Sequence, residues 1–471
     1  FYTRSMVYTM PEFLERRYNP QSRTILSVIS LVSYVLTKVA VTVYAGGLVF
    51  QQVFGIKELW GIDFFWIAAI GLVVLTALYT IFGGMKSVLY TSVLQTPILL
   101  LGSLIILVLG FKELGGWDEM MRVCGAVTVN DYGDTMTNLI RSNDDANFPW
   151  LGALIGSAII GFWYWCTDQF IVQRVLSGKN EMEARRGTIF GAYLKLLPVF
   201  LFLIPGMIAF ALHQKYISAG GEGFLPMLAN GTANADAAFP TLVAKLLPAG
   251  VKGLVVCGIL AALMSSLASL FNSSAMLFTI DFYKRFRPET PEKKLVGIGQ
   301  VATVVIVILG ILWIPIMRSV GDVLYTYLQD VQSVLAPGIA AAFLLGICWK
   351  RTSAQGGMWG LIAGMVIGLT RLGAKVYYSN AGEVADSTFK YLFYDMNWLF
   401  FCGWMFLFCI IVVIVVSLAT KAPTAEKIQG LVFGTATKEQ KAATRASWNH
   451  WDIIHTVIIL AITGAFYWYF W

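Results

Sequence analysis

The stretch that decides the fold is PWLGALIGSAIIGFWYWCTDQ, residues 149–169. It is apolar over nearly its whole length and carries no charge before Asp168. A segment needs about 20 mostly apolar residues to cross a bilayer, and its backbone amides must then be hydrogen-bonded within the segment. The stretch therefore predicts a transmembrane α-helix.

Aromatic residues crowd the far end of this predicted helix. At about 1.5 Å per residue from Pro149, Tyr164 lies roughly 22 Å along it, too deep for an interfacial aromatic belt. An aromatic ring can stack on the apolar C–H face of a sugar while its hydroxyl forms hydrogen bonds. Packing against neighbouring helices is the alternative, and it is favoured for Phe162 and Trp163.

The rest of the chain has the same character. Hydrophobic residues make up 57% without the 44 glycines, whereas soluble chains average about 45 to 50% with glycine included. Charged residues are only 13% and cluster between apolar runs. We predict eleven spans, at 24–54, 61–82, 86–111, 149–175, 186–213, 243–283, 293–317, 320–347, 353–374, 396–418 and 449–471.

The net charge of +7 follows this topology. No basic stripe with interleaved aromatics exists, so nucleic acid is not expected as a partner. Lysine and arginine concentrate in residues 1–23, 174–186, 284–294 and 421–445. The positive-inside rule therefore places residue 1 in the cytoplasm and the C-terminus outside, in a multi-pass protein of the plasma membrane or bacterial inner membrane.

Helix-breaking residues interrupt several predicted spans. Discontinuous helices near the middle of a bilayer mark transporter binding sites, although glycine and proline are also simply common in membrane helices. The breaks are expected at Pro198, at Pro205–Gly206, at Gly152, Gly156 and Gly161, and at Pro337–Gly338.

A pair of serines suggests an ion site. On a helix, the carbonyl of Ala262 and the hydroxyls of Ser265 and Ser266 can converge on one side, and Na+ prefers such oxygen ligands. The remaining ligands must come from another helix. Small-residue packing, with the serines bonding to their own helix, is the alternative.

Three ionisable residues lie within apolar stretches, where a charge needs a partner or water. We predict that Lys38 pairs with Asp168. Lys195 is either functional or extends to the membrane surface. The Gln329 amide suits either sugar hydroxyls or bonding between helices.

The sequence gives no indication of an enzyme. The histidines lie at the ends of predicted spans or in the last one, and neither a phosphate-binding glycine loop nor a metal-ligand cluster is present. An ion gradient is therefore the expected energy source.

Several longer motifs together resemble one family. The chain is similar to the sodium/solute symporters, and within them to the sodium-glucose (sodium/sugar) cotransporter branch. The most specific motifs are 163–169 (WYWCTDQ) with 171–174 (IVQR), 193–196 (YLKL), 264–269 (MSSLAS) with 271–273 (FNS), and 343–346 (FLLG) with 349–351 (WKR).

The resemblance implies an all-α polytopic membrane protein with a five-plus-five inverted-repeat (LeuT-type) core and extra flanking helices. N-terminal spans are expected to precede this chain. The implied parts are a cytoplasmic loop (1–23), the remaining helices of the first repeat (24–111), an extracellular loop (112–148), the second repeat (149–347), and peripheral C-terminal helices (348–471) with a cytoplasmic linker at 420–448.

The resemblance also implies a site. The solute is expected to lie under Tyr164 as an inner gate, with Tyr325 as an outer-gate aromatic. Relatives using a second sodium commonly place an aspartate where Ser92 stands, and this departure weighs against a second ion. The implied residues are Gly161, Tyr164, Trp165, Lys195 and Gln329 for the solute, Ala262, Ser265 and Ser266 for sodium, and Ser92 and Ser269 for a second sodium.

The expected function is sodium-coupled import of a glucose- or galactose-like sugar by alternating access. A myo-inositol or other polyol symporter, a transporter-derived sensor and a uniporting channel are the alternatives. Expected partners are the sugar or polyol, Na+ as the co-transported ion, membrane lipids and an accessory membrane subunit.

Overall fold

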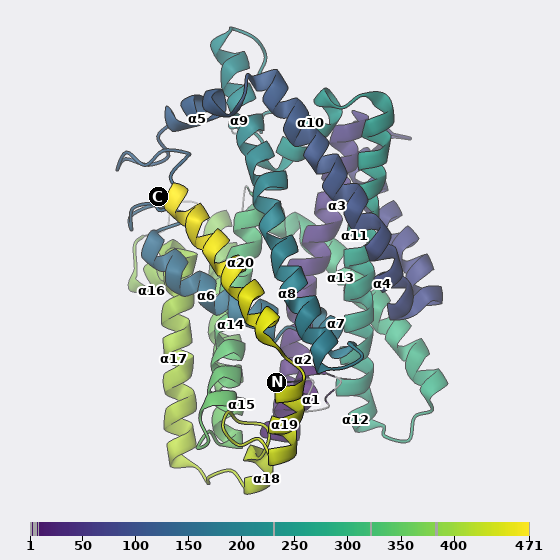
Figure 1. Cartoon of the computed structure of the whole chain (residues 1–471), viewed down its shortest axis with the longest axis vertical. Helices are drawn as coiled ribbons and strands as arrows, with labels where there is room; N and C mark the ends of the chain where they lie inside the picture. The colour runs from purple at the N-terminus through teal and green to yellow at the C-terminus, as the bar shows by residue number, and fades with distance from the viewer. Residues whose placement is uncertain are drawn as a thin grey trace. The chain divides into compact units, whose positions relative to one another are not determined.

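The computed structural model of the chain is almost entirely helical (Figure 1). It describes residues 2, 7, 9–228, 231–320, 323–381 and 385–470, apart from the side chains at 79, 81–89, 91, 94 and 318–320. Phe1 and Trp471, whose sides of the membrane the sequence predicts, lie outside these residues. Within the described residues, nine helices are long and apolar enough to span a membrane, or ten if one bent pair counts as a span.

The elements follow one another along the chain with a single short hairpin among the described residues. They are α1 (Met10–Arg17), α2 (Pro20–Ser33), η2 (Tyr34–Val39), α3 (Ala40–Phe54), β1 (Glu58–Leu59), β2 (Ile62–Asp63), α4 (Phe64–Leu114), α5 (Trp117–Gly125), α6 (Trp150–Cys166), α7 (Gln169–Leu176), α8 (Glu181–Pro198), η3 (Val199–Leu203), α9 (Ile204–Ser218), η4 (Ala235–Ala237), α10 (Ala238–Leu246), α11 (Ala249–Met276), η5 (Leu277–Tyr283), α12 (Lys284–Phe286), α13 (Glu292–Val320), α14 (Leu324–Cys348), α15 (Ala354–Asn380), α16 (Thr388–Lys390), η6 (Tyr391–Asp395), α17 (Trp398–Ala419), α18 (Ala425–Ile428), α19 (Lys438–Ala446) and α20 (His450–Tyr469).

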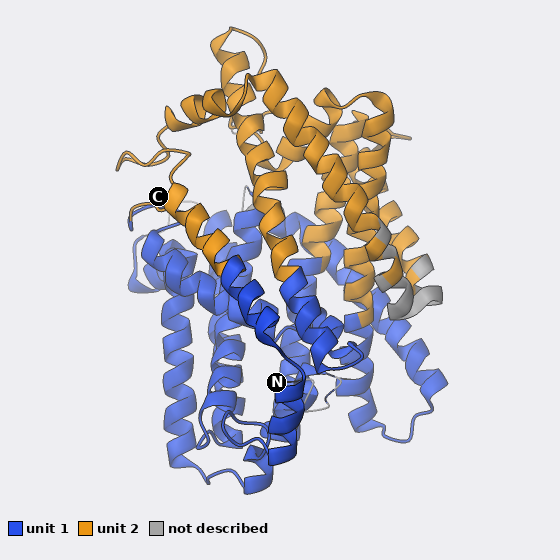
Figure 2. Cartoon of the chain, in the orientation of Figure 1, with its two compact units in different colours: residues 1–38, 143–190, 273–458 blue, residues 39–142, 191–272, 459–471 orange. Residues whose placement is uncertain are grey.

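The helices form two compact units, coloured separately in Figure 2. Unit 1 comprises residues 1–38, 143–190 and 273–458, and unit 2 comprises residues 39–142, 191–272 and 459–471. The segments η2, η3, η5 and η6 are π-helical. Such turns are uncommon and often mark functional positions in helices.

In unit 1, α14 packs between α15, α17 and α6. The prediction of a break at Pro337–Gly338 is wrong, because α14 is continuous there. A Cβ atom added to Gly338 would lie 2.8 Å from the Cα of Gly364 on α15, so this glycine allows two backbones to approach closely.

The glycines of α6 have the same role. A Cβ at Gly152 would lie 3.0 Å from the side chain of Leu399, and one at Gly156 would lie 2.9 Å from its backbone oxygen. The predicted break is real but comes later: α6 ends before Thr167 and α7 continues at an angle of 46°. Early glycines therefore serve packing against α17, and the bend follows the aromatic run.

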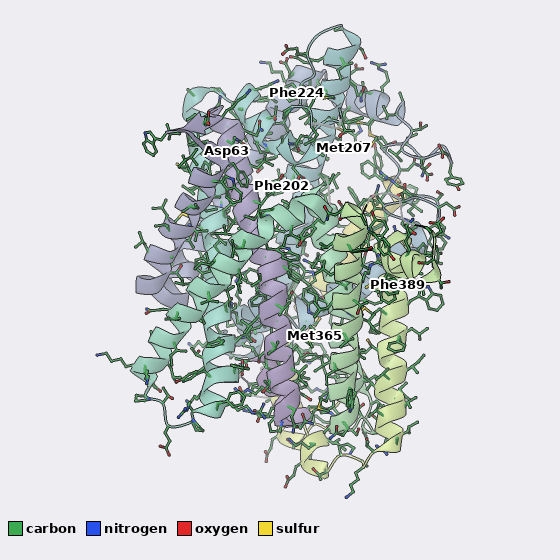
Figure 3. All side chains as sticks on the ribbon, turned by 180° about the vertical axis from the view of Figure 1, so that it is seen from behind. Asp63, Phe202, Met207, Phe224, Met365 and Phe389 are labelled. Carbon is green, nitrogen blue, oxygen red and sulfur yellow. The ribbon has the colours of Figure 1, made fainter. Side chains whose placement is uncertain are left out.

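Unit 2 contains one 51-residue helix, α4, where the sequence predicts two spans at 61–82 and 86–111. The backbone stays helical between these two predicted spans. Asp63 begins the helix by accepting a hydrogen bond from the Phe65 amide at 3.0 Å. Figure 3 marks Asp63 together with Phe202, Met207 and Phe224 of the same unit.

The predicted irregularity at Pro198 is confirmed. Five residues of π-helix, η3, follow this proline and join α8 to α9. Because proline has no N–H to donate, it removes one hydrogen bond of the regular helix and favours a local change of helical pitch.

The linker at 420–448 is less solvated than the sequence indicates. Leu431 and Val432 are buried, and the Phe433 amide donates to the Ile347 carbonyl at 2.8 Å. The Lys427 ammonium also donates to a backbone oxygen of α1 at 2.9 Å. The linker is therefore docked on unit 1, because Leu431 and Val432, two apolar residues within a polar segment, are buried there.

The segment before the first long helix is fixed as well. The Tyr18 hydroxyl donates to the Ala342 carbonyl at 2.7 Å, and the Arg17 Nε donates to the Gly346 carbonyl at 2.7 Å. Burial raises the pKa of the Tyr18 phenol, so it stays protonated and remains a donor. The Gly346 carbonyl lies in the last turn of α14, where a helix lacks internal donors, and the Arg17 side chain supplies one.

Candidate functional site

A buried ion pair lies at the centre of the candidate site in unit 1. The Lys38 ammonium contacts the Asp168 carboxylate, and the two side chains are only 9% and 2% exposed. The predicted pairing of Lys38 with Asp168 is confirmed. Each residue occupies an irregular point of the backbone, Lys38 in the π-helical η2 and Asp168 at the break between α6 and α7.

Further bonds hold the Asp168 carboxylate in place. It is the N-cap of α7, and its Oδ1 accepts from the Phe170 amide at 3.1 Å. The same oxygen accepts from the Tyr34 hydroxyl at 3.0 Å. A buried carboxylate needs such donors, so the break in the helix supplies part of what stabilises the charge.

Aromatic rings surround the Lys38 ammonium. Its Nζ lies 4.3 Å from the ring centre of Phe170, 4.7 Å from that of Tyr34 and 5.3 Å from that of Tyr164. Trp163 follows at 6.0 Å. Cation–π attraction at these distances links the predicted inner gate, Tyr164, to the ion pair.

Tyr34 and Phe170 belong to the site although neither lies among the residues that the sequence predicts for it. Tyr34 is four residues before Lys38, and residues four apart share a helix face. Phe170 is two residues after the capping Asp168, where the capped amide is expected. These spacings could have placed both residues beside the ion pair.

Three predicted solute residues share one face at the end of α6. Gly161, Tyr164 and Trp165 are spaced i, i+3 and i+4, which brings side chains together on a helix. The rings of Tyr164 and Trp165 meet edge to face with centres 5.2 Å apart, and Trp165 is 50% exposed. A Cβ added to Gly161 would find no heavy atom within 4 Å. The face therefore has two aromatics beside open space.

Gln329 and Tyr325 lie four residues apart on α14, on one face of that helix. Gln329 is partly buried and Tyr325 is 56% exposed. Between them, the Tyr327 hydroxyl accepts from Trp313 Nε1 at 2.6 Å and donates to the Leu36 carbonyl at 3.0 Å. Tyr327 thereby ties this part of α14 to η2, two residues from Lys38.

The hydrogen bonds and ring contacts described for unit 1 join Tyr164 to Trp165 and Lys38 and do not include Gln329 or Tyr325. Lys195 is exposed on the part of α8 that belongs to unit 2. The predicted solute residues are thus divided between the two units.

The predicted sodium residues lie together on α11 in unit 2. Ser265 is 8% exposed, Ala262 is partly buried and Ser266 is exposed. The Ser265 hydroxyl shares a hydrogen bond with that of Ser92 on α4, at 2.6 Å. Ser92, a residue predicted for a second ion, thus lies beside Ser265 of the first predicted group. A second helix therefore offers an oxygen to that group.

Ser269, the other residue considered for a second sodium, is fully buried on α11. In a regular helix the Ala262 carbonyl oxygen accepts a hydrogen bond from the amide four residues later. A cation would bind to the second lone pair of that oxygen.

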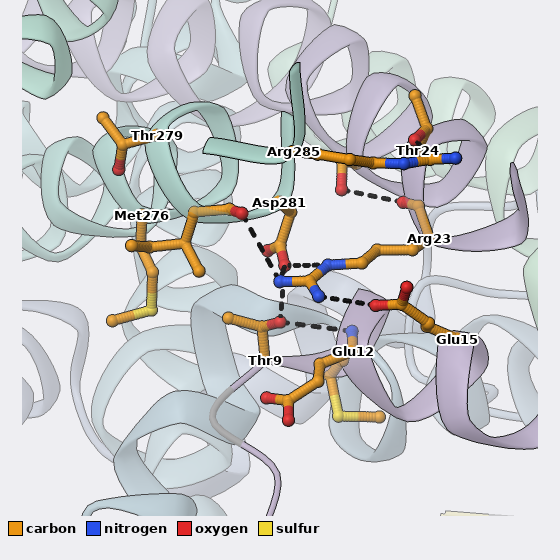
Figure 4. Close-up of polar contacts among 12 residues, drawn as sticks. Thr9, Glu12, Glu15, Arg23, Thr24, Met276, Thr279, Asp281 and Arg285 are labelled. Carbon is orange, nitrogen blue, oxygen red and sulfur yellow. Dashed lines mark hydrogen bonds and ion pairs between the residues drawn. The ribbon is translucent and has the colours of Figure 1, made fainter. Parts of the chain in front are cut away.

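A second buried charge cluster joins α2 to η5 in unit 1 (Figure 4). Asp281, fully buried in η5, accepts from Arg23 Nε at 2.7 Å and from the Thr9 hydroxyl at 2.9 Å. Arg23 also donates to Glu15 at 2.6 Å. The position of the acidic Asp281 within the apolar run LFTIDFY could have predicted this cluster, because a charge in such a run needs a partner. Two of the π-helical segments, η2 and η5, thus each hold a buried charge paired with another element.

Comparisons with known proteins agree on one family. The model described as "Sodium:solute symporter family" matches residues 1–364. The sodium/mannose cotransporter SLC5A10 of Bos taurus is 35% identical over 491 residues, covering 100% of this chain and 81% of that protein. Human sodium/myo-inositol cotransporter 2 is 35% identical, covering 92% of this chain, and sheep (Ovis aries) sodium/glucose cotransporter 1 is 37% identical, covering 89%. The chain spans 65% of the length of each of these two relatives.

A solved structure supports the fold. It is the substrate-bound outward-open state of a Na+-coupled sialic acid symporter, similar with a TM-score of 0.67 and 21% identity over 90% of this chain and 80% of that one. At this identity the likeness concerns the fold alone. The family model and the 35% identity to a relative covered over most of its length establish more: the chain belongs to the sodium:solute symporter family.

Proposed function

We propose that the protein is a sodium-coupled symporter that imports a small polyhydroxylated ring solute by alternating access. The observation that carries this proposal is the face of Gly161, Tyr164 and Trp165, which presents two aromatics beside open space directly before a break in the helix. Aromatic rings stack on the C–H face of a sugar, and discontinuous helices form the binding sites of such transporters.

An amide on α14 of the same unit adds to the proposed solute site. The Gln329 amide offers two donors and an acceptor to hydroxyl groups. Tyr164 is the inner gate, held in place by the ammonium of Lys38 at 5.3 Å. Tyr325 is the outer-gate aromatic, in keeping with its 56% exposure.

We propose a sugar of the glucose or galactose type as the solute, with myo-inositol as the second candidate. The identities to the sodium/glucose, sodium/mannose and sodium/myo-inositol cotransporters, 37%, 35% and 35%, support a hexose-sized ring and do not separate these solutes. Gly161 has no side chain, whereas relatives often have a polar residue at this position. The contacts to the solute are therefore expected to differ from those in such relatives.

The proposed sodium site consists of the Ala262 carbonyl and the hydroxyls of Ser265 and Ser266, with Ser92 as a further oxygen. Na+ would replace the hydrogen bond between Ser92 and Ser265, whose oxygens are 2.6 Å apart. Each hydroxyl has two lone pairs, so it can bind a cation while its proton turns elsewhere. Sodium favours the outward-open state to the extent that it binds that state more tightly.

Uptake by the full chain in proteoliposomes tests the proposal. An inward Na+ gradient is expected to concentrate labelled glucose, with galactose, mannose and myo-inositol as competitors. Tyr164→Ala should abolish uptake, whereas Tyr377→Ala, which truncates an exposed tyrosine of α15, should leave it unchanged. Solute that equilibrates without accumulation would identify a uniporter, and solute binding without any flux would identify a sensor. Myo-inositol as the best competitor would select the second candidate.

A further inference from the structure

An apolar groove of about 670 Å³ lies on unit 1 along α13. Its lining comes from three elements and includes Leu31 of α2, Phe278 of η5 and Gly297, Val301 and Val305 of α13. Among the described residues that line it, Lys294 is the one that carries a charge. None of the candidate solute and sodium residues lines the groove.

The groove has the length of one membrane leaflet. Its lining on α13 runs from Lys294 to Ile306, which is about 18 Å of helix rise at 1.5 Å per residue. The hydrocarbon region of a bilayer is roughly 30 Å thick, so one leaflet is about half of that. The groove would therefore contact an acyl chain lying along α13 over about the full depth of one leaflet.

The groove also has room for a chain next to its charged end. A Cβ added to Gly297 would find no heavy atom within 4 Å, one turn from Lys294. By contrast, a Cβ at the neighbouring Gly299 would lie 3.2 Å from Ala275, where α13 packs on the helix before η5. The two glycines thus distinguish the open side of α13 from its packed side.

Positive charge gathers at the Lys294 end. The segment from Lys284 to Lys294 holds five basic residues and two acidic ones, Glu289 and Glu292. Lys293 and Lys294 are both exposed, and only Lys294 lines the groove. The positive-inside rule predicts that this connection is cytoplasmic, where the leaflet carries anionic lipids.

We propose that this groove binds one anionic phospholipid of the cytoplasmic leaflet, with an acyl chain along Gly297, Val301 and Val305 and the phosphate at Lys294. The groove joins α2, η5 and α13, and the first two also share the contact between Arg23 and Asp281. A bound lipid therefore stabilises η5 against the helices on either side of it.

Lipid retention by the purified full chain tests the proposal. The chain in nanodiscs or detergent is exposed to equal amounts of phosphatidylglycerol and phosphatidylcholine, and bound lipid is counted by native mass spectrometry. Phosphatidylglycerol should be retained about fivefold better, the preference that one lysine near an anionic headgroup provides. Lys294→Gln should remove this preference, and its neighbour Lys293→Gln, the matched control, should keep it.

Two further variants test the chain-binding part. Gly297→Leu fills the groove from within, and Val301→Trp fills it from its 64% exposed side without changing helix packing. Both should lose the retained lipid, while Gly373→Leu, at another open glycine of unit 1, should keep it. Equal retention of the two lipids, equal effects of the two lysine variants, or undiminished lipid in the filled grooves would each overturn the proposal.

Discussion

The Tyr34 hydroxyl donates to Asp168 at 3.0 Å, although the two residues are 134 positions apart. Because the other oxygen of that carboxylate pairs with Lys38, one turn of η2 contributes two side-chain partners of Asp168. The capped start of α7 and the π-helical turn are therefore held together through this carboxylate and through the Phe170 amide, which also donates to the Tyr34 hydroxyl at 3.0 Å. The end of α6, with the proposed gate Tyr164, is adjacent to this link.

The buried ion pair should behave as a coupled unit. Lys38→Met or Asp168→Asn alone leaves a buried charge without its partner and should lower the free energy of unfolding by about 3 to 5 kcal/mol. The double variant leaves neither charge and should be more stable than the sum of the single effects by more than about 1 kcal/mol. Thermal or denaturant unfolding in detergent measures this, and Asn preserves the cap of α7.

The exposed pair of Lys390 and Asp386 is the control for that cycle. Lys390→Met should leave the melting temperature unchanged, because exposed pairs contribute little. Additive effects of the two single variants at Lys38 and Asp168 would show that the pair is not coupled.

The proposed sodium oxygens should affect sodium activation selectively. Ser265→Ala and Ser92→Ala should each raise the half-saturating Na+ concentration about tenfold, since a bond to a charged group contributes about 1.5 to 3 kcal/mol. Ser103→Ala is the matched control on α4, because that buried hydroxyl donates to its own helix at Leu99. Sodium dependence of solute uptake is the measurement. If the three variants were indistinguishable, Ser92 and Ser265 would not belong to the ion site.

The two kinds of glycine on α6 should respond differently to substitution. Gly161→Thr enters open space and should keep the melting temperature while changing the order of preference among competing sugars. Gly156→Thr meets the Leu399 backbone and should destabilise the protein by about 1 to 3 kcal/mol, the cost of overpacking. A panel of uptake competitors and a melting curve are sufficient. A sugar preference unchanged by Gly161→Thr would place the solute elsewhere.

The contact between Arg23 and Asp281 should control the order of η5. Asp281→Asn should lower the free energy of unfolding by about 3 kcal/mol, because it breaks a buried pair. Glu15→Gln removes the more exposed partner of Arg23 and should have a smaller effect. Hydrogen exchange of peptides covering 277–283 reports the loosening directly. Equal protection in the two variants would contradict the assigned importance of Asp281.

Much of the fold and part of the site could be predicted from the sequence. The symporter family, the helical membrane fold and Na+ as the transported ion of the family are confirmed. The pair of Lys38 and Asp168 could also be predicted, because opposite charges within apolar stretches both need a partner.

What escaped prediction depended on tertiary contacts. The local sequence does not distinguish a glycine that breaks a helix from one that lets two helices approach closely. Gly156 and Gly338 therefore could not be separated from true breaks. The rings of Tyr34 and Phe170 meet Lys38 only because η2 lies against α7. The burial of Leu431 and Val432 likewise depends on the surface that receives them.

The π-helical turn at 34–39 has one further consequence. A π-turn holds one residue more than the regular helix on either side of it, and each residue of an α-helix advances the side chains by about 100°. If the π-turn shifted along the chain by one turn, the side chain of Lys38 would rotate away from Asp168. The backbone amides and carbonyls of the segment would still form hydrogen bonds, each with a different partner. Deleting Leu36 would convert the segment to a regular α-helix and rotate Tyr34 away from the carboxylate. The deletion would therefore show the effect of the rotation without unfolding the segment.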